Sequence, residues 1–155
     1  MIAVIQRINS AEVVADGTLS GKAGKGLYIL LGVAGGDSES DSTALAEKIS
    51  KLRIFCDEND KMNLSVKDID GEVLVVSNFT LNANYAHGNR PDYLASASPD
   101  VADRLYMHFV SEMRARVRSC ETGVFGAHMI TNMSTDGPVT IVMDSKVLLK
   151  KGQKQ

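Results

Sequence analysis

The chain has 155 residues, 44% of them hydrophobic and 23% charged, with a formal net charge of −2. These values are ordinary for a globular protein with a real core, and they exclude a strongly basic nucleic-acid-binding protein, so any RNA contact must come from a local patch. The apolar run at residues 1–5 is too short for a signal peptide or a membrane span. Cys56 and Cys120 match no metal-binding spacing, and two isolated thiols suit a reducing compartment. We expect a cytoplasmic protein without a membrane partner.

Short apolar runs separated by turn signals open the chain and predict strands. Residues 2–8 and 11–15 are interpreted as two strands, Asp16-Gly17 as a hairpin turn and residues 18–23 as a returning strand. The most apolar run, residues 27–33, predicts a central strand.

Two segments have helical spacing. The first follows a capping residue, Asp37 or Ser38, and ends near residue 53. The second starts at Pro99-Asp100, since proline is tolerated in a first turn. The predicted buried stripes are Leu45, Ile49 and Leu52 in the first helix, and Ala102, Leu105, Phe109, Met113 and Val117 around the second.

The other predicted strands cover residues 54–56, 72–76, 121–127, 129–133 and 139–143. The long segment 82–98 has no sustained period and is expected to be irregular, as functional loops often are. Many strands with two principal amphipathic helices in mixed order predict an α+β fold with a curled, barrel-like and mainly antiparallel sheet. We expect one domain over residues 1–145 and a basic tail, 146–155, that frays at its end.

Asp136-Gly137-Pro138 interrupts the last two strand patterns. Proline cannot donate to a strand ladder, so Pro138 belongs at an edge, a bulge or the start of a strand, with nearby carbonyl groups free to face something else. Because Asp-Gly often marks plain hairpins, a simple hairpin corner is the alternative.

Familiar catalytic motifs are missing from the sequence. It has no Gly-x-Ser-x-Gly elbow, no His-Glu-x-x-His and no phosphate-binding glycine loop, and the three histidines are dispersed, so we expect no metal and no cofactor. What remains is the run Ser77-Asn78-Phe79-Thr80 at the end of a predicted strand. Its backbone amides are candidates for holding an oxyanion during acyl transfer, and the alternative is that Thr80 is an ordinary packed strand residue.

Several short motifs together resemble the D-aminoacyl-tRNA deacylase family. The two main ones are Ser77–Leu81 and Asp136–Thr140. The others, in chain order, are Ile5-Gln6-Arg7, Arg53-Ile54-Phe55, Lys61-Met62-Asn63, Arg90-Pro91, Ala97-Ser98-Pro99-Asp100 and Thr122-Gly123-Val124-Phe125-Gly126-Ala127. The sequence departs from the family pattern at Asn78, where glutamine is usual, and at Thr135, where asparagine is usual.

The resemblance implies a homodimer in which a cis Gly137-Pro138 bond enters the partner's active site. There its carbonyl groups would leave room for a D-aminoacyl group and collide with the side chain of an L-aminoacyl group, which is specificity by exclusion. A glycyl ester, which has no side chain, would pass. The resemblance also implies that Arg7 holds the corner, that Asp136 and Met62 support the site, and that Phe125 lies near the terminal adenosine, although a core aromatic is an equal interpretation of Phe125.

The family resemblance implies little side-chain chemistry. The ribose 2′-hydroxyl would help to activate water, and the Phe79 and Thr80 amides would steady the developing charge. The predicted function is therefore hydrolysis of the ester in D-aminoacyl-tRNA. Two alternatives stay open: a non-catalytic nucleic-acid-binding module that uses Arg114, Arg116 and Arg118, and a general esterase with Thr80 as its nucleophile.

Overall fold

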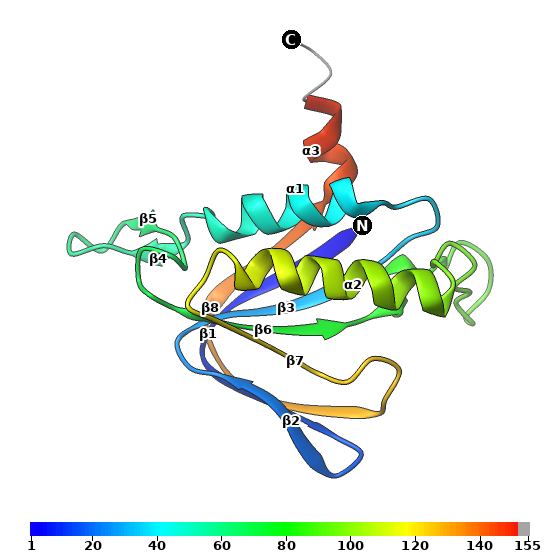
Figure 1. Cartoon of the computed structure of the whole chain (residues 1–155), viewed down its shortest axis with the longest axis horizontal. Helices are drawn as coiled ribbons and strands as arrows, with labels where there is room; N and C mark the ends of the chain where they lie inside the picture. The colour runs from blue at the N-terminus through cyan, green and yellow to red at the C-terminus, as the bar shows by residue number, and fades with distance from the viewer. Residues whose placement is uncertain (152–155) are drawn as a thin grey trace.

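The structure, a computed structural model, describes residues 1–151 and is built on a six-stranded sheet (Figure 1). The strand order is β2-β1-β3-β6-β7, and β8 pairs with the remaining edge of β1. All partners of β1 are antiparallel, whereas the β3–β6 and β6–β7 pairs are parallel. The strands are β1 (Ile2–Ala15), β2 (Thr18–Ala23), β3 (Gly26–Gly32), β6 (Glu72–Ser77), β7 (Ser119–Thr122) and β8 (Met129–Asp144), and a separate hairpin is formed by β4 (Phe55–Cys56) and β5 (Met62–Leu64).

The sheet curls until its two ends meet. The Lys22 N–H in β2 donates a 2.7 Å hydrogen bond to a carboxylate oxygen of Glu121 in β7. A Cβ atom on Gly21 would overlap the Thr122 carbonyl oxygen, so the backbones of β2 and β7 approach as closely as glycine allows. The predicted α+β fold with a barrel-like sheet is confirmed.

β1 and β8 are each one long strand rather than the two short strands predicted from sequence. Both halves of β8 pair with β1, with Met133 opposite Ala11 and Thr140 opposite Gln6. The chain therefore does not reverse at the Asp136–Pro138 corner, and the hairpin alternative is wrong. Between the Ile8–Thr135 and Gln6–Thr140 pairs, β1 advances two positions and β8 five, so the corner is an insertion that bulges from a continuous strand.

The strand predicted at residues 121–127 is misplaced. β7 ends at Thr122, and the chain then leaves the sheet through a turn. Gly126, with a φ of +75°, has the left-handed conformation that a strand cannot contain.

The helices α1 (Glu39–Ser50) and α2 (Pro99–Arg114) lie side by side over one face of the sheet (Figure 1). The core between helices and sheet contains the predicted Leu45, Ile49, Leu105 and Phe109, all fully buried. A short 3-10 helix, η1 (Phe79–Asn82), and a C-terminal helix, α3 (Ser145–Lys151), were not predicted. The expected fraying of the tail concerns residues 152–155, which lie outside the described residues.

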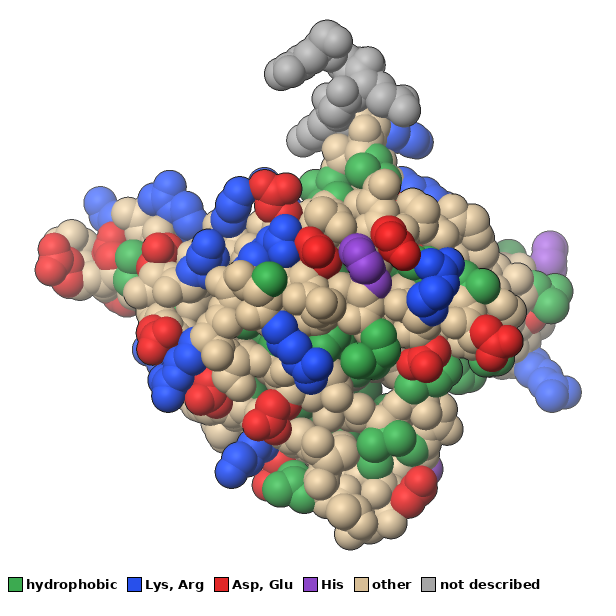
Figure 2. All heavy atoms as spheres, in the orientation of Figure 1, with side chains coloured by type: hydrophobic (Ala, Val, Ile, Leu, Met, Phe, Trp, Pro, Cys, Tyr) green, Lys and Arg blue, Asp and Glu red, His purple; other side chains and the backbone are tan. Residues whose placement is uncertain are grey.

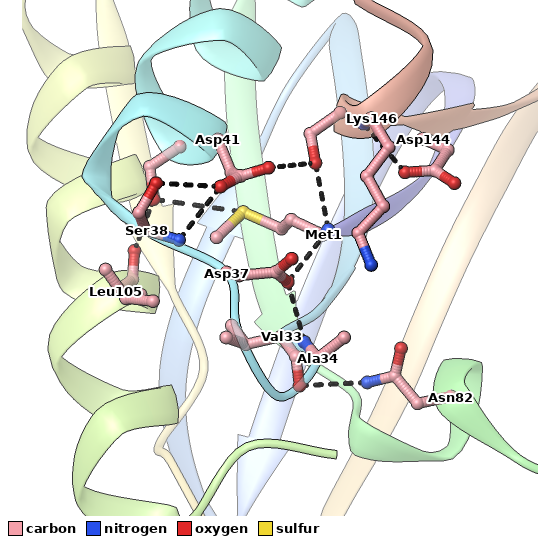
Figure 3. A network of polar contacts seen from close by, with 12 residues as sticks. Met1, Val33, Ala34, Asp37, Ser38, Asp41, Asn82, Leu105, Asp144 and Lys146 are labelled. Atoms are coloured by element: carbon pink, nitrogen blue, oxygen red, sulfur yellow. Dashed lines mark hydrogen bonds and ion pairs between the residues drawn. The ribbon is translucent and has the colours of Figure 1, made fainter. Parts of the chain in front are cut away.

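A buried polar network joins the start of the chain to the starts of α1 and α3 (Figure 3). The Met1 ammonium group lies 2.8 Å from an Asp37 carboxylate oxygen, and neither side chain has exposed surface. The same ammonium group donates to the Ser145 hydroxyl at 2.9 Å, and that hydroxyl donates to Asp41 at 2.6 Å. Asp41 also accepts hydrogen bonds from the N–H and hydroxyl groups of Ser38, and so fixes the first turn of α1.

Candidate active site

The Ser77–Thr80 run lies where a parallel strand ends, a common position for functional groups. β6 ends at Ser77, and the Asn78 N–H extends the ladder by donating to the Leu31 carbonyl at 2.8 Å. η1 then begins because the Asn78 side chain caps it. Its Oδ1 atom accepts from the Thr80 N–H at 3.2 Å and also from the Thr80 hydroxyl.

A pocket of about 470 Å³ opens beside this strand end, between β3, β6, α2 and the turn after β7. Ser77, Asn78, Phe79 and Phe125 all line it, so the structure brings these four predicted residues together. The remaining walls are largely apolar and include Leu31, Val33, Ala97, Ala102 and Met129. Such a pocket suits a small organic group that is oriented by a few polar contacts.

Tyr106 forms part of the pocket wall and was missed by the sequence prediction. Its hydroxyl donates a 2.9 Å hydrogen bond to the Val75 carbonyl, and its ring centroid lies 6.1 Å from that of Phe125. Burial raises the pKa of Tyr106 well above its ordinary value, so the phenol stays neutral. A signal for Tyr106 was present, since it is four residues after Ala102 and three before Phe109, on the inner face of α2.

Phe79 forms the rim of the pocket. Its side chain is 58% exposed, and its ring meets Tyr93 edge to face at a centroid distance of 5.0 Å. The Ser96 hydroxyl donates to the Phe79 carbonyl at 3.2 Å, which ties η1 to the segment before α2. Tyr93 and Ser96 also escaped prediction, because the segment that contains them has no periodic pattern.

The backbone amides at this end differ in their availability. The Phe79 N–H has no hydrogen-bond acceptor within residues 1–151, whereas the Thr80 N–H is held by Asn78. The exposed Thr80 hydroxyl donates to an amide oxygen, which is not a base and cannot take its proton. The arrangement thus offers backbone donors and no base contact for a threonine nucleophile.

The second set of predicted site residues lies around the bulge in β8. Arg7 donates from Nε to the Asp136 carbonyl at 2.9 Å and from a terminal nitrogen to the Ile54 carbonyl at 2.6 Å. Gly137-Pro138 is a cis peptide bond, both residues are exposed, and they line a shallow pocket of about 310 Å³.

Within one chain, the predicted residues at the end of β6 and those at the β8 corner line separate cavities. The corner residues line none of the pocket at the end of β6, and the pocket residues line none of the cavity at the corner. Met62 lies in neither cavity. It is 57% exposed on β5, in the hairpin at the opposite end of the molecule from the loop that follows β6 (Figure 1).

The three arginines at and just after the C-terminal end of α2 have partners inside the chain. Arg114 donates to the Cys120 carbonyl at 3.0 Å, Arg116 pairs with Glu112 at 2.8 Å, and Arg118 lies 3.6 Å from Asp70. In the part of the chain that the structure describes, no three His, Cys, Asp or Glu residues are grouped so that they could hold a metal ion. No helix within residues 1–151 has the length and apolar character needed to span a bilayer.

Solved structures with this architecture include the c-Myc DNA Unwinding Element Binding Protein, with a TM-score of 0.87 and 35% sequence identity over 93% of this chain and 98% of that one. A probable eukaryotic D-amino acid tRNA deacylase, 15% identical, has the same fold with a TM-score of 0.78 over 92% of this chain. These two likenesses establish the fold of the chain.

The family follows from the sequence matches. The D-aminoacyl-tRNA deacylase of Caldicellulosiruptor saccharolyticus is 51% identical over 94% of this chain and 98% of its own length. The D-aminoacyl-tRNA deacylase of Flavobacterium johnsoniae is 47% identical with the same coverage. The model of the D-Tyr-tRNA(Tyr) deacylase family matches residues 4–144, and the chain belongs to that family.

Proposed function

We propose that this protein, as a single deacylase domain of residues 1–145 in the cytoplasm, hydrolyses the ester of D-aminoacyl-tRNA and releases the D-amino acid and free tRNA. The observation that carries the proposal is the pocket at the end of β6, which is lined by Phe79 and largely apolar walls, together with the Phe79 N–H, which has no acceptor among the described residues. Membership of the D-Tyr-tRNA(Tyr) deacylase family supports the choice of substrate.

The chemistry asked of the protein is modest. An aminoacyl ester is already activated, so hydrolysis needs water to attack and a donor for the oxyanion that forms. A preorganised backbone amide in a dry pocket stabilises such an oxyanion. In other enzymes, loss of one such donor lowers the rate by about 10²–10³. The Phe79 N–H takes this role directly, and the Thr80 N–H joins it when Asn78 releases it. Ser77 and Phe125 shape the pocket around the terminal adenosine.

In this proposal, D- and L-aminoacyl groups are distinguished by steric exclusion. The Gly137 and Pro138 carbonyl groups of a second copy enter the pocket and lie against the α-carbon of the substrate. A D-residue presents hydrogen there, an L-residue presents its side chain and collides, and a glycyl ester passes. Support comes from the exposure of the corner and from its separation, within one chain, from the pocket that it would have to enter.

The same arrangement accounts for the supporting residues. Arg7 and Asp136 hold the corner in position through their hydrogen bonds. Met62, exposed on the β4–β5 hairpin, is assigned to the contact with the second copy. The functional unit is thus a homodimer with two shared sites.

The deciding experiment offers matched D-tyrosyl-, L-tyrosyl- and glycyl-tRNA to the purified protein and follows the deacylation of each. The proposal expects rapid loss of the D-tyrosyl and glycyl esters and protection of the L-tyrosyl ester. Equal turnover of the D- and L-esters would refute the filter, and turnover of none of the three would refute the deacylase assignment.

One observation favours a rival. A structural relative with 35% identity is called a DNA-unwinding-element binding protein, which favours the alternative of a non-catalytic nucleic-acid-binding module. That rival predicts salt-dependent binding of uncharged tRNA without ester turnover, so the same deacylation assay separates the two.

A further inference from the structure

Residues 84–94 form a loop that is attached at both ends to the rim of the pocket. The segment starts two residues after η1 and ends two residues before Ser96, whose hydroxyl is bonded to the Phe79 carbonyl. In Figure 1 this loop projects from the end of the molecule where α2 begins.

The loop is held in a defined shape. Asn84 and Asp92 exchange two backbone hydrogen bonds of 2.8 and 2.9 Å, and their side chains are joined by a third of 3.0 Å. The amide oxygen of Asn84 accepts from the Ala86 N–H, and the second carboxylate oxygen of Asp92 accepts from the Leu94 N–H. The exposed side chains of the loop are therefore held on a preorganised backbone.

The side chains exposed on this loop are unusually apolar for a surface loop. Tyr85 is 81% exposed and Leu94 is 91% exposed, and the contacting rings of Phe79 and Tyr93 are exposed as well. Scattered surface hydrophobics are ordinary, but four within 16 consecutive residues at the rim of a pocket indicate a contact surface. Tyr85 stacks on no other ring within residues 1–151, so its faces are open.

A cation accompanies these rings. Arg90 is exposed and forms no ion pair within the described residues, unlike Arg116 and Arg118. Figure 2 shows Lys/Arg and His side chains beside hydrophobic ones at this end of the molecule. An open aromatic ring and a guanidinium group without an ion pair, displayed on one loop, are the combination that binds single-stranded nucleic acid, with the ring on a base and the cation on a phosphate.

We propose that the loop 84–94 binds the single-stranded nucleotides that precede the terminal adenosine of the aminoacyl-tRNA, with Tyr85 stacking on a base and Arg90 contacting a phosphate. The inference rests on the proposed function, because it takes the terminal aminoacyl-adenosine as the occupant of the adjoining pocket. Continuity with that pocket favours RNA over the other candidate occupant, a second copy of this chain. Stacking on any base tolerates sequence, which suits an end shared by many tRNAs.

The test compares two substrates that differ only in these nucleotides: D-tyrosyl-tRNA and the D-tyrosyl ester of adenosine. For Tyr85→Ala we expect kcat/KM on the tRNA to fall about tenfold more than on the adenosine ester. Tyr85→Phe keeps the ring and should restore the value. Leu19→Ala, at a side chain 53% exposed on the distant strand β2, is the matched control and should affect neither substrate. For Arg90→Gln, the slope of log affinity for tRNA against log salt should become shallower by about 0.7.

Equal losses on both substrates for Tyr85→Ala would overturn the proposal, because they would indicate a structural effect on the pocket. So would no loss on tRNA, or a change in the oligomeric state of the variant in sedimentation, which would assign the surface to a second copy. Failure of the wild-type protein to hydrolyse either substrate would instead refute the proposed function, so the two failures are distinguishable.

Discussion

Arg7 in β1 and Asp136 in β8 are joined by three contacts at the edge of the bulge. The Nε atom of Arg7 lies 2.9 Å from the Asp136 carbonyl oxygen and 3.0 Å from a carboxylate oxygen, and a terminal nitrogen lies 3.3 Å from the other carboxylate oxygen. The Arg7 side chain is only 12% exposed and also donates to Ile54, so it connects the bulge to the segment before β4. The position of the corner is thus set by one guanidinium group with several fixed bonds.

Replacement of Arg7 by alanine should loosen the proposed chirality filter at Gly137-Pro138. With the corner free to shift, L-tyrosyl-tRNA is no longer excluded, and the ratio of D to L turnover should fall by about tenfold or more, because displacements of about 1 Å can change rates 10²-fold. The measurement is deacylation of both enantiomers, with the free energy of unfolding in urea recorded beside it. Arg7→Lys is the comparison that keeps the charge without the planar fork, and it should recover only part of the ratio. An unchanged ratio in a folded Arg7→Ala protein would contradict the role of the corner.

Thr80 tests whether a side chain carries the reaction. Its hydroxyl donates to the Asn78 amide oxygen, and replacement by alanine removes one hydrogen bond between neutral groups, worth about 1 kcal/mol. We therefore expect single-turnover hydrolysis of D-tyrosyl-tRNA to slow by less than about tenfold. Loss of a covalent nucleophile would instead cost on the order of 10⁶ in kcat. A loss of that size in Thr80→Ala, with recovery in Thr80→Ser, would establish the general-esterase alternative.

Local patterns were enough to predict much of the fold. A cap at Asp37 or Ser38 and the apolar spacing over Leu45 and Ile49 predicted α1, whose N-cap is Ser38, and Pro99 marked the first residue of α2. The long strands were predicted as fragments because register shifts interrupt their alternation, as between Gln6 and Ser10 in β1. Those shifts arise from pairing between strands more than 100 residues apart, which a local pattern does not contain.

Part of the candidate site was likewise predictable from local patterns, and part was not. The motif at Ser77–Thr80 was placed correctly at a strand end, and Phe125 lines the same pocket. The apolar side chains that complete that pocket, such as Leu31 and Met129, come together only through tertiary packing. The separation of Gly137-Pro138 from the pocket was equally invisible to local reasoning, since it depends on which strand each half of β8 joins.

Closure of the barrel depends on Gly21. A Cβ atom there would overlap the Thr122 carbonyl oxygen, and both partners are backbone held by their own strands. Gly21→Ala should therefore lower the free energy of unfolding by about 1–3 kcal/mol, the usual cost of overpacking. Gly35→Ala is the control, because its Cβ would lie 3.7 Å from the Ala95 carbonyl oxygen, an ordinary contact, and should cause no loss. Equal stability of the two variants in urea titrations would show that β2 and β7 are not in tight contact.

Asp41 lies at the centre of the buried network that joins the start of the chain to α1 and α3. Burial alone would raise the pKa of Asp41, but hydrogen bonds from Ser145 and Ser38, together with the nearby α-ammonium group, outweigh burial and hold it below its ordinary value. A carboxyl group whose pKa is lower in the folded state stabilises the fold above its unfolded pKa, which is about 3.9. That contribution disappears as the pH falls through the folded pKa.

Asp41→Asn should consequently destabilise the protein in a pH-dependent way. At pH 7 the variant loses the charge-assisted bonds to Ser38 and Ser145, and its free energy of unfolding should be about 2 kcal/mol below that of the wild type. Below about pH 4 the Asp41 carboxyl group of the unfolded wild type takes up a proton, so the difference should begin to shrink, and it disappears once the pH is below the folded pKa. Urea titrations of both proteins between pH 7 and pH 3 measure this difference directly, and other acidic groups cancel because both proteins carry them. Glu58→Gln, at an exposed loop position, should show almost no difference at any pH. If the gap for Asp41→Asn were the same at pH 3 as at pH 7, the ionised carboxylate would not be the group that secures this network.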